Sequence, residues 1–335
     1  MSEPERILLS HGGGGKRARE LVEREFVSVF ADDVLGELGD SAIVAGASRL
    51  AFTTDSFVVK PIFFPGGDIG RLAVCGTVND LAVAGATPLY ISLAMILEEG
   101  LLVEDLRRVV ASVKTSADEA RVRIVCGDTK VVEHGAADGM YLTTSGVGSI
   151  ADDVDLSPGR IRAGDVVLVS GTLGDHAIAV MSAREGIEFR TEVRSDVQPL
   201  ADLARALMSR AEVRCMRDPT RGGAAGVLNE LAAAAGCAVE LDEKSIPVTA
   251  GVRAACDVLG LDPLYAANEG KLIAIVSPDT ADAALDTLRS HPRGRDAARI
   301  GTVHDDKPGR VTLRTTLGGR RIDDMPLGEQ LPRIC

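Results

Sequence analysis

The amino-acid sequence predicts an α+β protein of two domains followed by a short C-terminal tail. The chain has 335 residues, and its hydrophobic fraction of 45% and mean hydropathy of +0.13 supply enough apolar side chains for two cores. Helix-like and strand-like patterns occur in both halves. Between residues 150 and 164 the sequence IADDVDLSPGRIRAG is polar and rich in turn-forming residues, which is typical of a boundary. The predicted units are residues 1–153, residues 154–318 and the tail 319–335.

The first half contains two helical and three strand-like patterns. Residues 49–59 (RLAFTTDSFVV) are β-branched and partly alternating, which predicts a strand with Asp55 near its centre. Residues 70–88 (GRLAVCGTVNDLAVAGATP) predict a helix that ends between Gly85 and Pro88. Apolar residues at helical spacing predict an amphipathic helix over residues 103–120. Two further strands are predicted at residues 121–126 and 140–146.

The second half repeats this mixture. The continuous apolar run DVVLVSG, residues 165–171, predicts a buried strand. Helices are predicted near residues 197–210, 223–235, 250–260 and 280–290, and strands near residues 237–242, 271–277, 298–304 and 310–316. After Thr316 the periodicity fades, which predicts a loosely held tail.

Charge and composition exclude several classes of function. The net charge of −12 argues against a surface that neutralises nucleic-acid phosphates or anionic lipids. Aromatic residues make up 3% of the chain and Trp is absent, so base-stacking surfaces are not expected either. The apolar run from Ala82 to Leu97 is interrupted by Gly85, Thr87 and Pro88, and the first residues are acidic, so neither a membrane span nor a signal peptide is indicated. We expect a cytoplasmic protein whose partners are small molecules or other proteins.

The six cysteines do not indicate a metal site or a disulfide framework. They show no CxxC pair and no histidine at ligand spacing, so most of them are expected to be buried, reduced thiols. Cys335 differs because it ends the chain in the sequence GEQLPRIC. Composition alone does not distinguish an inert thiol from a reactive one at this position.

Two glycine-containing segments could bind phosphate. HGGGGK, from His11 to Lys16, offers bare backbone amides and a cation, although its spacing is not that of a P-loop. An unstructured N-terminus is the alternative interpretation. RDPTRGG, residues 217–223, precedes an Ala-rich helical pattern, and free amides at a helix start favour anions. An ordinary helix cap explains this segment equally well.

Several carboxylates stand in apolar or turn contexts. Asp55 lies within a predicted strand, Asp80 within a predicted helix, and Asp128 follows a strand directly. Buried acids are costly unless they are paired or bind a metal, and carboxylate oxygens suit Mg²⁺ carried by a nucleotide. Each acid alone could instead be a cap, a turn residue or a satisfied core acid. Lys130 is expected to point to the same side as Asp128 if the chain is extended there, and Glu269 lies on a turn before a strand.

Read in order, ten motifs resemble the HypE family of hydrogenase maturation proteins. They are HGGGGK, TTDSF, FFPGGDIG, GTVNDLAVAGA, ILEEGL, CGDTKVV, SGTLGDH, RDPTRGG, ANEGK and the terminal LPRIC. That family belongs to the superfamily of aminoimidazole ribonucleotide synthetase and selenophosphate synthetase. The resemblance implies a PurM-like fold and a homodimer in which the sheets of the two N-terminal domains pair into a barrel, with ATP in the groove between domains and subunits.

The resemblance also implies a reaction. The thiol of Cys335 would accept a carbamoyl group from the carbamoyltransferase HypF, and ATP would drive dehydration of this carboxamide to a thiocyanate. The cyanide would then pass to iron held by a HypC–HypD complex. A tail of about ten residues reaches on the order of 33 Å when extended, enough to visit a partner and then the protein's own cleft.

The resemblance and the residue chemistry together assign a site. The expected catalytic residues are Cys335, Glu269 as base, Lys130 as charge stabiliser and Asp80. The expected Mg²⁺ ligands are Asp55, Asp80 and Asp128. ATP is expected to contact His11, Gly12, Gly14, Gly15, Lys16, Asp55, Asn79, Gly127, Asp128, Thr129, Asp218, Thr220, Arg221, Gly222 and Gly223.

Two alternatives belong to other classes. A small-molecule kinase or a selenophosphate synthetase would share the superfamily, but the latter is expected to carry Cys or selenocysteine beside the early glycine-rich lysine, and HGGGGKR has none. A non-enzymatic scaffold with a docking tail would explain Cys335 but neither the acids nor the glycine-rich segments. Prenylation of the CaaX kind needs the cysteine four residues from the end.

Overall fold

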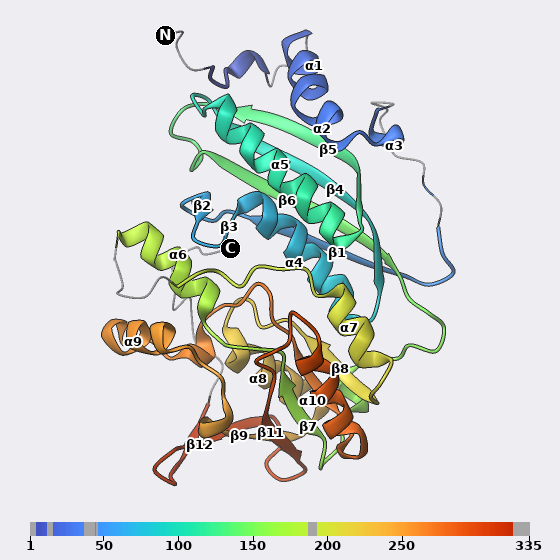
Figure 1. Cartoon of the computed structure of the whole chain (residues 1–335), viewed down its shortest axis with the longest axis vertical. Coiled ribbons are helices and arrows are strands. Elements are labelled where there is room, and N and C mark those ends of the chain that lie inside the picture. The colour runs from blue at the N-terminus through green and yellow to red at the C-terminus, as the bar shows by residue number, and fades with distance from the viewer. Residues whose placement is uncertain (1–4, 12–15, 37–43, 45, 187–192, 324–335) are drawn as a thin grey trace.

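Two large sheets, one in each half of the chain, organise the fold (Figure 1). The computed structural model describes residues 5–11, 16–36, 44, 46–186 and 193–323. The first sheet has the strand order β1-β6-β4-β5 and consists of β1 (Leu50–Phe57), β6 (Met140–Ser149), β4 (Thr87–Glu98) and β5 (Arg123–Val132). β4 and β5 are parallel, and the other pairs are antiparallel. A short hairpin of β2 (Phe63–Phe64) and β3 (Gly67–Asp68) precedes the first long helix.

Two helices cover one face of this sheet, α4 (Ile69–Val83) and α5 (Val103–Ala120) (Figure 1). Asp68 caps α4 by accepting hydrogen bonds from the N–H groups of Gly70 and Arg71 at 2.7 and 3.0 Å. The predicted apolar face of α5 is buried, which confirms that helix. α4 is buried almost all around because the second half of the chain covers its remaining side.

β4, the strand between β6 and β5, has no counterpart among the elements expected from the sequence. Its outward positions mix apolar Tyr90, Ala94 and Ile96 with polar Ser92 and Glu98. Because its outward face is only partly polar, the sequence shows no clear alternation there.

Short helical segments lead into the first sheet: η1 (Leu9–His11), α1 (Lys16–Val22), a π-helical turn η2 (Glu23–Val27), α2 (Ser28–Phe30) and α3 (Asp33–Gly36). They are fastened to α5 by the buried carboxylate of Glu25, which accepts hydrogen bonds from Arg24 at 2.5 Å and from Arg107 at 3.0 Å. These segments therefore form a layer over the α5 side of the sheet (Figure 1).

The second sheet has seven strands in the order β13-β12-β9-β11-β7-β10-β8. They are β7 (Val166–Val169), β8 (Val213–Arg217), β9 (Ala238–Asp242), β10 (Ile273–Val276), β11 (Ala298–His304), β12 (Arg310–Arg314) and β13 (Arg320–Ile322). Only β12 and β9 are paired in parallel. β7 and β10 are buried at every position, as the apolar run at residues 165–171 predicts for the first of them.

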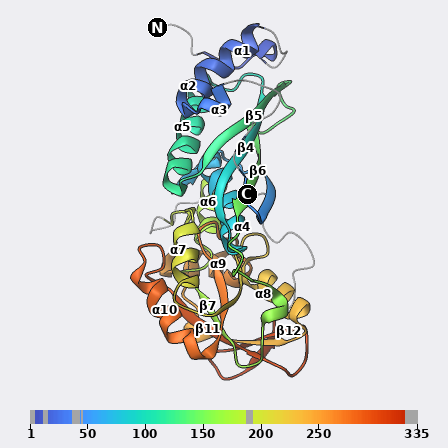
Figure 2. The ribbon, with the colours of Figure 1, turned by 90° about the vertical axis from the view of Figure 1, so that its right-hand side faces the viewer.

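Helices cover both faces of the second sheet (Figure 2). The helices of this half are α6 (Asp175–Glu185), α7 (Ala201–Met208), α8 (Gly223–Ala235), α9 (Ala250–Leu259) and α10 (Ala281–Ser290), with short helical turns η3 (Pro158–Arg160), η4 (Glu243–Ser245), η5 (Pro263–Tyr265) and η6 (Pro278–Thr280). α8 packs on one face, and α7 with α10 packs on the other. α6 and β8 were not predicted from the sequence.

The two halves share part of one core. Ala82 and Val83 at the end of α4 pack with Leu200, Leu203 and Leu207 around α7. The carboxyl-terminal end of α4 therefore lies at the junction of the halves. Among the described residues, no helix combines the length and apolar character needed to cross a bilayer.

The first residues of the predicted tail 319–335 belong to the second sheet. Residues 320–322 form β13 and pair with β12, and Asp323 after them is buried. The pattern was missed because β13 is only three residues long and exposed along its length. Cys335 lies outside the described residues.

Candidate functional site

Asp55 and Asp80 lie close together where β1 faces α4. Asp55 occupies one of the alternate half-buried positions of β1. Asp80 Oδ2 accepts a hydrogen bond of 2.7 Å from the hydroxyl of Thr53. Asp55 Oδ2 is buried and has no hydrogen-bond partner among the described residues. Burial and the neighbouring Asp80 carboxylate raise the pKa of Asp55 to about 6, and Arg221 opposes this rise.

Two acids from the second half join this pair. Asp218 follows β8 directly, and burial together with the charges of Asp80 and Asp55 raises its pKa to about 7. Glu269 is 3% exposed, and burial, followed by the charge of Asp218, raises its pKa well above the usual range. We call Asp55, Asp80, Asp218 and Glu269 the acidic cleft. Asp218 and Glu269 are buried and Asp55 and Asp80 are half-buried, so the four carboxyl groups repel one another strongly and the cleft favours protons or a bound cation.

The RDPTRGG segment brings a cation and a helix start to the same cleft. α8 begins at Gly223, and Gly222 and Gly223 have φ values of +78° and +61°. A Cβ atom at Gly223 would lie 2.4 Å from the carbonyl oxygen of Leu264, so this position excludes a side chain. Thr220 N–H donates to the carbonyl of Asp218 at 3.0 Å, which closes the turn that carries Arg221. Arg221 acts electrostatically on Asp55, so a positive charge from this turn faces the cleft.

Asn79 connects the halves of the chain beside the cleft. Its side chain is 1% exposed, and its Nδ2 donates to the carbonyl oxygens of Gln198 and Glu269, each at 3.1 Å. Its Oδ1 accepts from the N–H of Leu200 at 2.8 Å. The amide of Asn79 is thus used for backbone contacts here, and a contact with ATP stays a prediction.

Asp128 and Lys130 lie apart from the acidic cleft. They stand two residues apart on β5, side chains 61% and 64% exposed, and Lys130 Nζ is 3.2 Å from Asp128. The predicted common direction of these two side chains is confirmed. β6 and β4 separate β5 from β1, which places Asp128 about 14 Å from Asp55 at the usual strand spacing. One metal ion in a single chain therefore cannot contact all three predicted ligands.

The described residues contain no group of three or more His, Cys, Asp or Glu side chains arranged to hold a metal ion. Asp55 and Asp80 remain the pair of predicted ligands that the fold brings together. The buried, unpartnered Oδ2 of Asp55 fits the binding of a cation at this pair.

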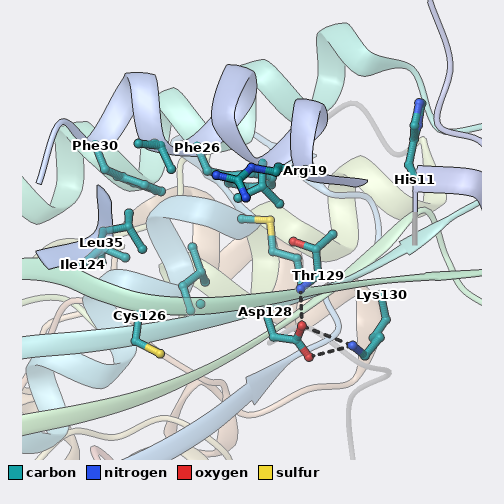
Figure 3. Close-up of a pocket in the computed structure, with 15 residues that line it drawn as sticks. His11, Arg19, Phe26, Phe30, Leu35, Ile124, Cys126, Asp128, Thr129 and Lys130 are labelled. Carbon is teal, nitrogen blue, oxygen red and sulfur yellow. Dashed lines mark hydrogen bonds and ion pairs between the residues drawn. The ribbon is translucent and has the colours of Figure 1, made fainter. Parts of the chain in front are cut away.

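A cavity of about 360 Å³ lies between the N-terminal helices and the first sheet (Figure 3). Apolar side chains line it from both sides, among them Phe26, Phe30, Leu35, Leu93, Met95 and Ile124. His11 and Arg19 also line it, and Thr129 points to the same side of β5 as these helices, whereas Asp128 and Lys130 point to the other (Figure 3). Gly12, Gly14 and Gly15 lie outside the described residues, and Lys16 is the first residue of α1. The cavity was not predicted.

The remaining cysteines are free thiols. Cys75, Cys215, Cys237 and Cys256 are buried and Cys126 is half-buried. Burial raises the pKa of Cys75 to about 12, which makes it a poor nucleophile. The prediction of buried, unpaired thiols is confirmed for the described cysteines.

Comparisons with known proteins identify the family. Residues 38–150 match the N-terminal domain, and residues 162–314 the C-terminal domain, of AIR synthase related proteins. Carbamoyl dehydratase HypE of Bradyrhizobium diazoefficiens is 51% identical over 332 residues, which cover 98% of this chain and 96% of that protein. HypE of Rhodobacter capsulatus is 49% identical and covers 99% of this chain. The chain belongs to the HypE family of carbamoyl dehydratases.

Solved structures agree with this assignment. A HypE structure in complex with ATP has a TM-score of 0.95 and 47% identity, and it covers 98% of this chain and 100% of that one. HypE in a HypE–HypF complex has a TM-score of 0.81 and 46% identity over 91% of this chain. A thiamine-monophosphate kinase from Stenotrophomonas maltophilia, at 24% identity and a TM-score of 0.64, shares the fold alone. The predicted two-domain PurM-like fold and HypE resemblance are confirmed.

A further acid, Asp196, lies beside Glu269 and is not among the site residues expected from the sequence. Asp196 forms a buried ion pair with Lys271, with 3.0 Å between Nζ and Oδ2. In the sequence it is a single aspartate in the segment VRSDVQPL, between a polar stretch and an apolar helix. Such an aspartate is common in loops, so only its contacts distinguish it.

Proposed function

We propose that this chain catalyses the ATP-dependent dehydration of an S-carbamoyl group on its own Cys335 to a thiocyanate, which supplies cyanide for the iron of NiFe hydrogenase. The observation that carries the proposal is the acidic cleft at the junction of the two halves, with Arg221 beside it, in a chain of the HypE family. A pair of acids that could hold a cation, next to a buried carboxyl group that can take a proton, suits phosphoryl transfer to a carboxamide.

The chemistry consists of two steps. In the first, the carboxamide oxygen attacks the γ-phosphorus of ATP, the bond to ADP breaks, and the nitrogen loses one proton to Glu269. In the second, the carbon–oxygen bond breaks, phosphate leaves with the second nitrogen proton, and the nitrile forms. Phosphorylation is needed because the oxygen of a carboxamide is otherwise a poor leaving group. The products are the thiocyanate, ADP, phosphate and one proton.

The residues of the cleft support these steps. Asp55 and Asp80 would hold Mg²⁺, which neutralises phosphate charge when bound, whereas Asp128, three strands away, cannot bind the same ion within one chain. Arg221 and the turn that precedes α8 suit the phosphate oxygens. Lys130 stays the proposed charge stabiliser.

The apolar cavity beside η1 suits the adenine ring of ATP. It has apolar walls from helices and strands, and Arg19 and His11 line it as well. His11 directly precedes the glycine-rich residues 12–15 in the sequence, and the backbone amides of such a segment suit phosphate. This arrangement favours HGGGGK as part of the nucleotide site.

The last described residues fasten the start of the tail. The side chain of Asn229 donates to the carbonyl of Asp323 at 2.8 Å, and the hydroxyl of Tyr265 donates to Asp323 Oδ1 at 3.0 Å. Tyr265 lies in η5, whose chain continues into Glu269. Cys335 is twelve residues beyond Asp323 and can reach roughly 40 Å from it. Such a tether would keep the thiol at high effective concentration near the cleft.

Partners follow from the reaction. A carbamoyltransferase must load Cys335, and HypF is the proposed donor because a HypE relative has been solved with HypF. An iron-carrying HypC–HypD complex is the proposed acceptor of the cyanide. A cytoplasmic location stays a prediction.

The function is tested on the C-terminal peptide. The full chain is incubated with Mg²⁺, carbamoyl phosphate and HypF, once under conditions in which this chain hydrolyses ATP and once under conditions in which it does not. The mass of the peptide that carries Cys335 is then measured. We expect a carbamoyl adduct that loses the mass of one water only when this chain hydrolyses ATP. Cys335→Ser should show neither change. An adduct that never loses water would disprove the dehydratase function.

A homodimer through the outer face of the first sheet is part of the proposal. Phe52 and Leu50 on β1 are 71% and 53% exposed, and Ile96 on β4 is 39% exposed. Apolar side chains on one exposed sheet face are typical of an interface. Asp128 and Lys130 project from β5 on the side away from the covering helices, so a dimer through this face would place them at the subunit boundary.

Phe52→Asp is expected to convert the dimer into monomers, because a charge in the centre of an apolar interface is left without a partner. Light scattering after gel filtration measures the mass. Val258→Asp is the control, since Val258 on α9 is also apolar and is 79% exposed. If both variants remain dimers, the outer face is not the interface.

A further inference from the structure

The backbone N–H and the carbonyl oxygen of Glu269 are both hydrogen-bonded to side chains. Asp196 Oδ1 accepts a hydrogen bond of 3.1 Å from the N–H of Glu269, and Asn79 Nδ2 donates one of 3.1 Å to its carbonyl oxygen. Asp196 Oδ2 accepts from the N–H of Gly270 at 3.3 Å and from Lys271 Nζ at 3.0 Å. One carboxylate thus binds three consecutive residues, 269, 270 and 271.

The backbone of this segment packs closely against its neighbours. A Cβ atom at Gly270 would lie 1.8 Å from the carbonyl oxygen of Asp196, so backbone meets backbone there. Gln198 Nε2 donates to the carbonyl of Gly270 at 2.9 Å. The stem of Lys271 fills the space over Gly171, where a Cβ would lie 2.9 Å from Cε. The backbone at residue 270 therefore lies directly against the backbone of Asp196.

Burying the Asp196–Lys271 ion pair costs desolvation free energy. The side chains of Asp196 and Lys271 are 4% and 9% exposed. Burial opposes the charge of Asp196, and Lys271 together with His176 nevertheless holds its pKa below the usual range. Replacing a buried ion pair with apolar side chains is often neutral or stabilising, so stability alone does not explain this pair.

The segment that carries Asp196 connects both halves of the chain. The N–H of Ser195 donates to the carbonyl of Pro65 at 2.8 Å in the β2–β3 hairpin, and Ser195 Oγ lies 2.8 Å from His176 Nδ1. The N–H of Leu200 binds Asn79, the residue next to Asp80. The segment that holds Glu269 through Asp196 is therefore also hydrogen-bonded to α4, the helix that carries Asp80.

We propose that Asp196, paired with Lys271, is a positioning residue that acts through the backbone of residues 269–271 and fixes the Glu269 carboxyl group at the reacting carboxamide. The inference rests on the proposed function, in which Glu269 takes a proton from the substrate nitrogen. Asp196 itself need not touch the substrate. Its contribution lies in orientation, because small displacements of a catalytic group lower rates strongly.

A double-mutant cycle with Glu269 tests the inference on the full-length protein. Asp196→Ala/Lys271→Met removes the acceptor oxygens without leaving an unpaired buried charge. In single turnovers of carbamoylated Cys335, we expect this pair of substitutions to slow water loss about 10²-fold with the KM for ATP unchanged. In a Glu269→Gln background, the same substitutions should cause no further loss, because the group that Asp196 positions is already missing.

Asp196→Asn/Lys271→Gln keeps one acceptor oxygen and should fall between the wild type and the Ala/Met protein. If the Ala/Met protein does not fold, the Asn/Gln protein carries the same cycle. An equal loss in both backgrounds, or no loss in either, would overturn the positioning role. If the wild type itself never loses water from carbamoylated Cys335, the proposed function fails instead, and with it the inference.

Discussion

Glu269→Gln is expected to slow the dehydration of carbamoylated Cys335 by about 10²- to 10⁴-fold, the usual contribution of a general base. Glutamine has nearly the same shape but cannot accept the proton. The fold and the loading of Cys335 should be unchanged, because the raised pKa of buried Glu269 already favours its uncharged form. Single-turnover mass measurement of the tail peptide gives the rate.

The pH dependence adds a second readout for the same variant. Since Glu269 must be ionised to act, the acid limb of the rate profile should lie above the usual glutamate value of 4.5 in the wild type. That limb should be lost in the residual activity of Glu269→Gln. Glu230→Gln on the exposed side of α8 is the control and should behave as the wild type. An unaltered rate for Glu269→Gln would show that another group is the base.

Asp80→Asn is expected to block water loss while leaving carbamoylation of Cys335 intact. The asparagine can still accept the hydrogen bond from Thr53, so local structure should be kept. Its missing charge should weaken cation and phosphate binding in the cleft. Normal dehydration by this variant would remove Asp80 from the site.

The same substitution should stabilise the folded chain at high pH. Asp55 and Asp218 have pKa values of about 6 and about 7, above the ordinary 3.8, and in both cases Asp80 is the foremost charged cause after burial. A raised carboxyl pKa means that the folded chain holds protons more tightly, so stability falls as pH rises from about 4 to about 7. Removing Asp80 should lower both pKa values and relieve this cost.

Thermal unfolding measures this effect. At pH 8 the cost is complete, and Asp80→Asn should raise the free energy of unfolding by roughly 1–3 kcal/mol. The gain should shrink as the pH falls toward 4. Asp306→Asn, an exposed residue, removes one negative charge elsewhere and should not show this pH dependence. Added Mg²⁺ should stabilise the wild type at pH 8 more than Asp80→Asn. A gain that does not depend on pH would contradict the acidic cleft.

The sequence by itself determined much of the secondary structure and the chemical class. Helical spacing defined α5 because one face of that helix is buried and the other is exposed, and α9 and α10 show the same contrast. The sequence could not reveal β4, whose outward positions mix apolar and polar residues, nor β13, which is too short to show a period. The terminal motif and the order of the glycine-rich and acidic motifs led to the family.

Only the tertiary structure decided which acids meet. Asp55, Asp80, Asp218 and Glu269 are far apart along the chain, and the packing of the two halves at the end of α4 brings them together. Burial and mutual repulsion then raise the pKa of Asp55, Asp218 and Glu269. Asp128 looked equivalent in the sequence, but the strand order places it three strands from Asp55. Asp196 has no distinguishing pattern in the sequence. Its three contacts with residues 269–271 exist only because the loop that carries it packs against the segment before β10. Local pattern reflects which side of an element is buried, whereas these distances depend on how distant elements pack.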